Sequence, residues 1–206
     1  MIDAQGRACL AVSGGRSPIA LFAALRVMPL RWADVCVTLV DERAVPPEHA
    51  DNNARLVREH LLKDAAAAAR FFPIVLPPHV HGESVDVDAC VATANEPFQQ
   101  PDVVILGMGD DGHTASLFPD APELTEGIDR THAPAYLSLR PAAAPHRRIS
   151  LNLSALSAAR RLFLSIAGPV KRTVFDAAAQ GGVQPALPVS YVIHQREVPL
   201  DVYWTA

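Results

Sequence analysis

The chain has 206 residues, half of them hydrophobic, which is enough for one sizeable α/β domain with a substantial core. A formal net charge of −4 argues against a nucleic-acid binder that relies on a broad basic surface. No apolar run has the length of a membrane span, and the first residues lack the apolar core of a signal peptide. Three widely spaced cysteines without a C-x-x-C pair are typical of small buried side chains in a reducing cytoplasm.

Strand-like and helix-like segments alternate along the chain. Predicted strands cover residues 8–12, 35–40, 71–76, 102–106, 136–139, 149–153, 162–166, 190–193 and 200–204. Predicted helices cover residues 18–27, 52–62, 86–96 and 170–179, and the polar segment 123–131 is expected to be a mobile surface loop. This alternation predicts one α/β domain over residues 1–206, with a mostly parallel sheet covered by helices on both faces, as in a Rossmann-like fold.

The segment from Gly107 to Pro119 carries the most information about function. It follows a predicted buried strand, and its glycines let the backbone turn sharply where that strand ends. In an open α/β sheet, ligands bind at the carboxyl ends of the strands. Asp111 and His113 are therefore predicted to face a ligand.

The same segment also fits a dinucleotide-binding pattern. Gly107, Gly109 and Gly112 spell G-x-G-x-x-G after a strand. Asp110 and Asp111, however, stand where a pyrophosphate needs backbone N–H groups and positive potential. The charges therefore disfavour a dinucleotide site.

The turn at residues 13–18 is a candidate anion site. Gly14 and Gly15 permit a tight turn with converging N–H groups, and the following helix adds positive potential. Arg16 and Ser17 add further donors. Taken alone, the segment supports phosphate binding and an ordinary strand-to-helix turn about equally.

Three other segments carry charges next to predicted strands. Asp41 and Arg43 end the second strand, where they either cap the next segment or face a ligand. Lys171 lies in the first turn of a predicted helix, where it opposes the helix dipole, so that either a bound phosphate or simple solvation explains it. Arg148 begins a strand and either reaches a ligand or is solvated.

In their order along the chain, these segments resemble the 6-phosphogluconolactonases, which share a superfamily with the glucosamine-6-phosphate deaminases. The matching segments are residues 13–18, 41–46, 52–53, 107–119, 148–151 and 168–171. Deaminase-like members carry Tyr at the position of Arg43 and Ile-Ala-Phe-Asn-Glu in place of residues 114–118. Both differences favour the lactonase branch.

The resemblance implies hydrolysis of 6-phospho-D-glucono-1,5-lactone without a metal or other cofactor. It makes His113 the general base and Asp111 the carboxylate that orients it. Arg43 then stabilises the oxyanion or binds the phosphate, and Asp41 contacts substrate hydroxyls. The expected substrate-binding and phosphate-binding residues are Ser13, Gly14, Gly15, Arg16, Ser17, Asn53, Gly109, Arg148 and Lys171.

The expected binding partner is a small sugar phosphate, and neither a nucleic acid nor a membrane is expected to bind. The protein is expected to be cytoplasmic and to be a monomer or a homodimer. Two other functions stay open: an amino-sugar-phosphate deaminase or isomerase, and a sugar-phosphate sensor without turnover. The first motif lies close to residue 1, whereas relatives usually have an additional strand and helix before it, and we expect the domain to lack these two elements. We therefore expect an apolar face of the sheet that is covered in another way.

Overall fold

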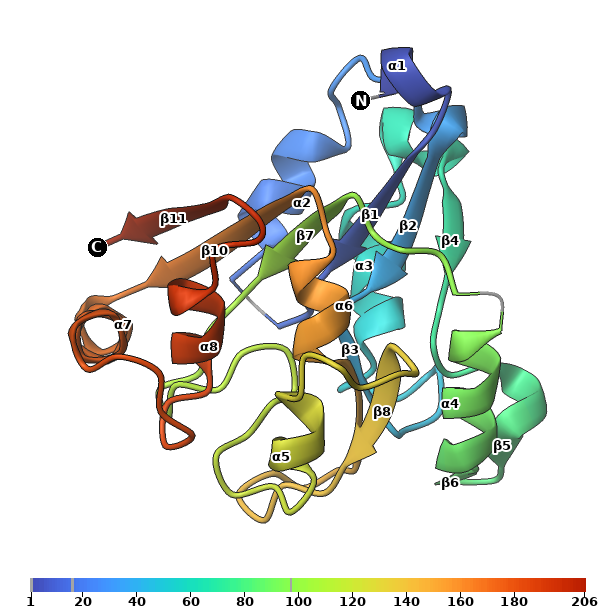
Figure 1. Cartoon of the computed structure of the whole chain (residues 1–206). Coiled ribbons are helices and arrows are strands. Elements are labelled where there is room, and N and C mark those ends of the chain that lie inside the picture. The colour runs from blue at the N-terminus through green and yellow to red at the C-terminus, as the bar shows by residue number, and fades with distance from the viewer. Residues whose placement is uncertain (1, 16, 97) are drawn as a thin grey trace.

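The computed structural model describes residues 2–15, 17–96 and 98–206 and contains a six-stranded, fully parallel sheet (Figure 1). Its strand order is β11-β10-β7-β1-β2-β4. The bounds are β1 Ala8–Val12, β2 Val35–Leu39, β4 Arg70–Phe72, β7 Val103–Leu106, β10 Arg161–Ala167 and β11 Leu200–Thr205. Because the order reverses between β1 and β7, their carboxyl ends open onto the crevice where ligands bind in such sheets.

A second, three-stranded sheet is antiparallel, in the order β3-β9-β8. It is formed by β3 Asp41–Arg43, β8 Tyr136–Leu139 and β9 Arg148–Leu151. Val40 joins the two sheets, since its N–H donates to Val12 of β1 and its carbonyl accepts from Leu151 of β9. The chain thus leaves the parallel sheet after β2 and enters the second sheet one residue later.

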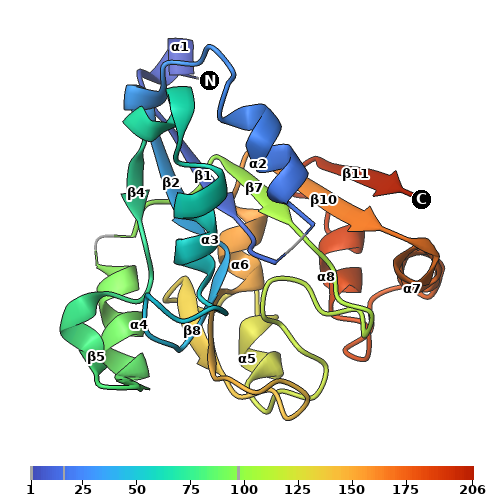
Figure 2. The ribbon, with the colours of Figure 1, turned by 180° about the vertical axis from the view of Figure 1, so that it is seen from behind.

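Helices cover both faces of the parallel sheet, as predicted (Figures 1 and 2). On one face lie α2 Ile19–Leu25 and α3 Asn53–His60, and on the other lie α6 Leu153–Ser157 and α8 Val189–His194. Helix α4 Val87–Asn95 packs against β8, and α7 Pro169–Gln180 against α8. The short elements are α1 Ile2–Gln5, α5 Leu124–Gly127, the hairpin of β5 Val80–His81 and β6 Ser84–Val85, and the 3₁₀ turns Trp32–Asp34, Asp64–Ala68 and Pro77–His79. None of the helices in the described ranges is long and apolar enough to cross a bilayer.

Three sequence predictions about elements are wrong. Residues 190–193 lie in helix α8, because periodicity alone does not separate a short apolar strand from a buried helix. The strand predicted over 71–76 ends at Phe72, and the apolar residues Ile74 and Val75 are buried in the connection that follows. Residues 123–131 include α5, in which Leu124 is buried, so the segment is anchored to the core.

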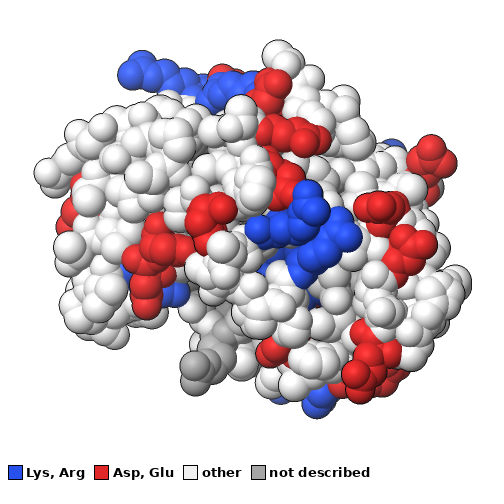
Figure 3. Space-filling model, turned by 90° about the horizontal axis from the view of Figure 1, so that it is seen from below, with Lys and Arg blue, Asp and Glu red and all other residues white. Residues whose placement is uncertain are grey.

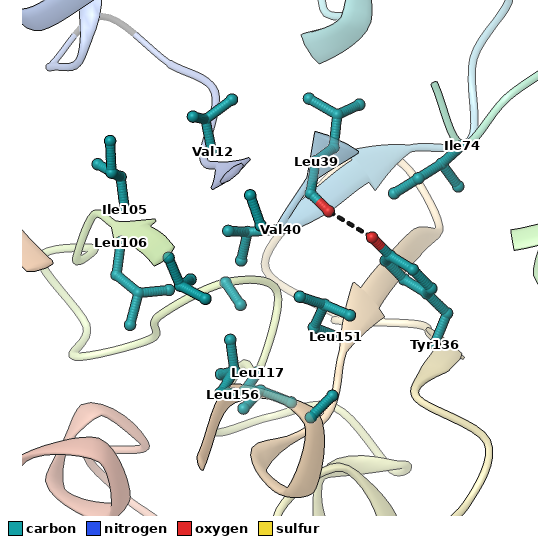
Figure 4. Packing of buried hydrophobic residues seen from close by; sticks show 14 of the residues in the cluster. Val12, Leu39, Val40, Ile74, Ile105, Leu106, Leu117, Tyr136, Leu151 and Leu156 are labelled. Atoms are coloured by element: carbon teal, nitrogen blue, oxygen red, sulfur yellow. Dashed lines mark hydrogen bonds between the residues drawn. The ribbon is translucent and has the colours of Figure 1, made fainter. Parts of the chain in front are cut away.

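The hydrophobic core extends from the parallel sheet to the second sheet beneath the ligand crevice (Figure 4). Leu39 of β2 accepts a hydrogen bond of 2.6 Å from the Tyr136 hydroxyl of β8. Leu117, from the segment that follows β7, is fully buried and belongs to the same core as Leu156 (Figure 4). Burial of the apolar Leu117 side chain therefore holds the Gly107–Pro119 segment against the core.

The α2 side of the parallel sheet has an apolar hollow of about 680 Å³. Its lining residues include Ile2, Leu10, Leu25, Phe163 and Tyr203. Of these residues, Tyr203 is the most exposed. This sheet face bears apolar side chains that the described part of the chain leaves partly uncovered.

Candidate active site

A cleft of about 230 Å³ lies where β1, β3 and β7 end and α7 begins. Its lining residues are Ser13, Gly14, Gly15, Ser17, Asp41, Arg43, Asn53, Gly107, Met108, Gly109, His113, Ala115 and Lys171. Ten of the thirteen predicted site residues are among them. Of the other three, Asp111 and Arg148 contact lining residues or their neighbours, and Arg16 lies outside the described residues.

His113 and Asp111 form a hydrogen-bonded pair at the cleft. His113 Nδ1 lies 2.6 Å from Asp111 Oδ1, and the backbone N–H of His113 donates to the same oxygen over 3.1 Å. The imidazole also stacks on Phe118, with ring centroids 3.9 Å apart and planes inclined by 24°. Because Nδ1 is occupied by Asp111, Nε2 is the ring atom left for chemistry.

Competing effects act on the Asp111 carboxyl. Partial burial raises its pKa, but the hydrogen bonds and charge of His113 outweigh burial and bring the pKa below its usual value. Asp111 is therefore ionised near neutral pH and can hold an imidazolium beside it.

The glycine at position 109 brings this pair close to the backbone. A Cβ there would lie 2.2 Å from His113 Nδ1 and 2.5 Å from Asp111 Oδ1. The turn is closed by a 2.9 Å hydrogen bond from the Gly109 N–H to the His113 carbonyl. Farther along, Ala115 lines the cleft with φ +52°, a left-handed conformation that few non-glycine residues adopt.

Asp41 faces the cleft with one carboxylate oxygen already bonded. Its Oδ2 accepts a 2.6 Å hydrogen bond from the Ser116 hydroxyl, and its backbone carbonyl accepts one of 2.9 Å from Asn53. Both contacts fix its position at the carboxyl end of the sheet. The predicted contact of Asp41 with substrate hydroxyls remains a prediction.

Two arginines of the second sheet carry like charges side by side. Arg43 of β3 and Arg148 of β9 are direct partners in the antiparallel register, a placement that destabilises a strand pair. Burial, followed by the charge of Arg43, lowers the pKa of Arg148. The Nε of each arginine is buried without a hydrogen-bond partner in the described part of the chain. An anion bound beside the pair would relieve both costs.

The cleft is also lined by the turn after β1 and the start of α7. Gly15 has φ +85°, and a Cβ on Gly14 would lie 1.9 Å from Asn53 Oδ1, so both positions require glycine. Lys171 lies in the first turn of α7, as predicted. Among the described residues it has neither a hydrogen bond nor an ion pair. Its ammonium group is thus available to a ligand in the cleft.

The sequence matches one protein family along nearly the whole chain. The family described as "Glucosamine-6-phosphate isomerases/6-phosphogluconolactonase" matches residues 1–204. A Neisseria meningitidis protein named 6-phosphogluconolactonase is 46% identical over 203 residues, which are 98% of this chain and 87% of that protein. This chain belongs to the glucosamine-6-phosphate isomerase/6-phosphogluconolactonase family.

Solved structures of similar proteins share the fold. A crystal structure of a Neisseria gonorrhoeae protein matches with a TM-score of 0.93 at 47% identity, covering 98% of this chain and 87% of that one. The 6-phosphogluconolactonase of Shewanella baltica matches with a TM-score of 0.87 at 37% identity, covering 100% of this chain and 86% of that one. The α/β fold class predicted from the sequence is therefore confirmed.

Glu42 supports the site in this family member, and the sequence analysis did not select it. Its fully buried carboxylate accepts hydrogen bonds from the backbone N–H groups of Arg43, Asn53 and Ala54, at 2.7–2.8 Å. Burial raises the pKa of Glu42 to about 7. The sequence could have indicated this buried position, because side chains alternate along a strand and Glu42 therefore points to the opposite face from Asp41 and Arg43.

Phe118 is the second residue that the sequence analysis did not select. It stacks on His113, and the Arg148 guanidinium lies over the same ring, 5.6 Å from its centroid. Phe118 therefore links the imidazole to the arginine pair. An aromatic residue inside a polar, glycine-rich segment was the available signal.

Proposed function

We propose that the chain is a 6-phosphogluconolactonase, which hydrolyses 6-phospho-D-glucono-1,5-lactone to 6-phospho-D-gluconate. The observation that carries this proposal is the His113–Asp111 pair at a cleft that also contains Lys171. Family membership and the names of the relatives support it. The reaction is the second step of the oxidative pentose phosphate pathway, and the proposal keeps the expectation of a cytoplasmic protein.

Chemistry begins at the free ring nitrogen of His113. Nε2 takes a proton from a water molecule, whose oxygen attacks the lactone carbonyl carbon and forms a tetrahedral oxyanion. When the carbonyl reforms, the bond to the ring oxygen breaks, and that oxygen takes the proton from the imidazolium. Asp111 holds the imidazolium between these steps through its bond to Nδ1.

The positive groups in and beside the cleft suit a phosphorylated substrate. In this proposal Lys171, the 13–17 turn and Arg148 bind the phosphate, and Arg43 stabilises the oxyanion or contributes to phosphate binding. Asp41 and Asn53 contact ring hydroxyls. On the face seen in Figure 3, one group of Lys and Arg side chains lies near the centre and is bordered by acidic ones, so a local cationic surface coexists with a negative net charge.

The test is hydrolysis of freshly generated lactone, coupled to 6-phosphogluconate dehydrogenase, at a pH that slows spontaneous ring opening. We expect turnover well above background, and a loss of about 10²–10⁴ in kcat for His113→Ala, the range for removal of a general base. His79→Ala is the matched control, because His79 bonds to Thr93 and does not line the cleft. It should retain wild-type turnover.

Other outcomes identify the other two functions. Ammonia release from glucosamine 6-phosphate without lactone hydrolysis would indicate the deaminase. Binding of 6-phosphogluconate by folded protein without turnover would indicate the sensor. Wild-type turnover in His113→Ala would remove His113 from the mechanism.

A further inference from the structure

We propose that His49, Asp51 and His146 form a binding site for one divalent transition-metal ion of the Zn²⁺ class. None of the three lines the active-site cleft, and the inference is independent of the proposed hydrolysis. His49 and Asp51 lie on the connection between β3 and α3, and His146 lies just before β9. The site therefore joins two segments that are far apart in the sequence.

The three side chains already converge. One ligand atom from each lies within 4.8 Å of the other two. His146 Nε2 is 2.9 Å from Asp51 Oδ2, and His49 Nδ1 is 4.0 Å from the same oxygen. Tetrahedral coordination at about 2.1 Å places ligand atoms about 3.4 Å apart, which lies within this range. Small side-chain rotations are thus enough to form the site.

The donor set selects the class of ion. Two imidazoles and one carboxylate suit Zn²⁺, Ni²⁺ or Cu²⁺, whereas Mg²⁺ and Ca²⁺ prefer oxygen ligands. The side chains of His49, Asp51 and His146 are 43%, 51% and 23% exposed, so an ion reaches them from solvent and keeps a position for water. Coordination by His49 Nδ1 replaces the 3.1 Å hydrogen bond that the Asp51 N–H now donates to it.

A bound ion would join the segments that lead to the two arginines. The Asp51 carbonyl accepts a 2.6 Å hydrogen bond from Arg43 Nη1, and His146 precedes Arg148 by two residues. Cross-linking the two connections stabilises the folded state, since the unfolded chain does not present the site. The site thus predicts a metal-dependent gain in thermal stability.

The experiment is calorimetric titration of the metal-free protein with Zn²⁺ in a phosphate-free buffer, with Tm measured in parallel. We expect one equivalent to bind and Tm to rise by a few degrees near saturation. His146→Gln and His49→Gln should each weaken binding by at least about tenfold. His81→Gln is the matched control, since it changes an exposed histidine outside the cluster and should bind as the wild type does.

Three results would overturn the proposal. One is undetectable Zn²⁺ binding by the wild type, which would leave His146 and Asp51 as a simple hydrogen-bonded pair. A second is binding that survives both substitutions. A third is binding that is lost in His113→Gln, which would place the ion at the cleft instead. Should His146→Gln not fold, the more exposed His49→Gln decides, with the visible spectrum of bound Co²⁺ reporting loss of the histidine ligand.

Discussion

Three residues of its own segment fix the position of the His113 side chain. Asp111 Oδ1 bonds to its Nδ1, Phe118 supports its ring face, and Gly109 leaves room for both. His113 can be recognised as a base from the sequence, because the residues that hold it are its near neighbours along the chain. Arg148 is different, because its significance comes from facing Arg43 across a strand pair that no local pattern reveals.

Lys171 and its neighbour give a prediction about substrate binding. If Lys171 holds the phosphate equally in the ground and transition states, Lys171→Ala should raise KM by about tenfold or more and change kcat little. Arg172→Ala is the control, because Arg172 is on the same helix turn but pairs with Asp176 and lies over Trp204. Steady-state kinetics of both variants are the measurement. An unchanged KM in Lys171→Ala would indicate that Lys171 is a solvated charge that does not bind the phosphate.

At the scale of elements, two of the three glycines in the turn after β7 have different surroundings. A Cβ on Gly109 would collide with the His113–Asp111 pair, whereas a Cβ on Gly107 would meet no atom within 4 Å. Gly109→Ala should therefore displace the pair and lower kcat by about 10²-fold, as a misplacement of about 1 Å does. Gly107→Ala should leave the His113–Asp111 pair in place and lower kcat less. Equal activities for the two variants, measured in the lactone assay, would contradict this account.

The first N–H groups of helix α3 donate to the buried Glu42 carboxylate, and this gives a prediction about how stability depends on pH. The pKa of Glu42 is about 7 in the folded protein, against an ordinary value of 4.5. A group whose pKa is raised by folding contributes stability below its unfolded pKa, and that contribution is lost as pH rises through the folded pKa. The free energy of unfolding of the wild type relative to Glu42→Gln should therefore fall between about pH 4.5 and pH 7.

Urea unfolding at several pH values measures this difference. Glu59→Gln is the control, since Glu59 is an exposed carboxylate on the same helix, and its pKa is lowered by the hydrogen bond from Arg55. It should lack the fall between pH 4.5 and 7. A Glu42→Gln difference that grows with pH would refute the argument.

The elements that the sequence predicts well are those with local signals. Asn52 caps α3 by accepting from the Arg55 N–H, and Asp86 caps α4 in the same way. The second sheet was not predicted as a separate sheet, because its pairing joins Asp41–Arg43 to strands about a hundred residues later. Nothing in a window of a few residues encodes such a partner.

At the scale of the whole molecule, the cleft is assembled from widely separated parts of the chain. The turn after β1, the β3 segment, the turn after β7 and the start of α7 meet because β1 and β7 are neighbours at the point where the strand order reverses. The parallel order was predictable from the alternation of strands and helices. The depth and lining of the cleft required the structure, since they depend on how the second sheet packs beneath it.

The apolar hollow on the α2 side of the parallel sheet affects how this protein can be studied. Its volume of about 680 Å³ lies in the range of pockets that accept drug-sized apolar molecules. We therefore expect the folded protein to enhance the fluorescence of the dye ANS before any unfolding. Fluorescence equal to that of free dye would contradict this. If the enhancement is seen, dye-based melting curves will start from a high baseline, and circular dichroism will be the sounder way to follow unfolding.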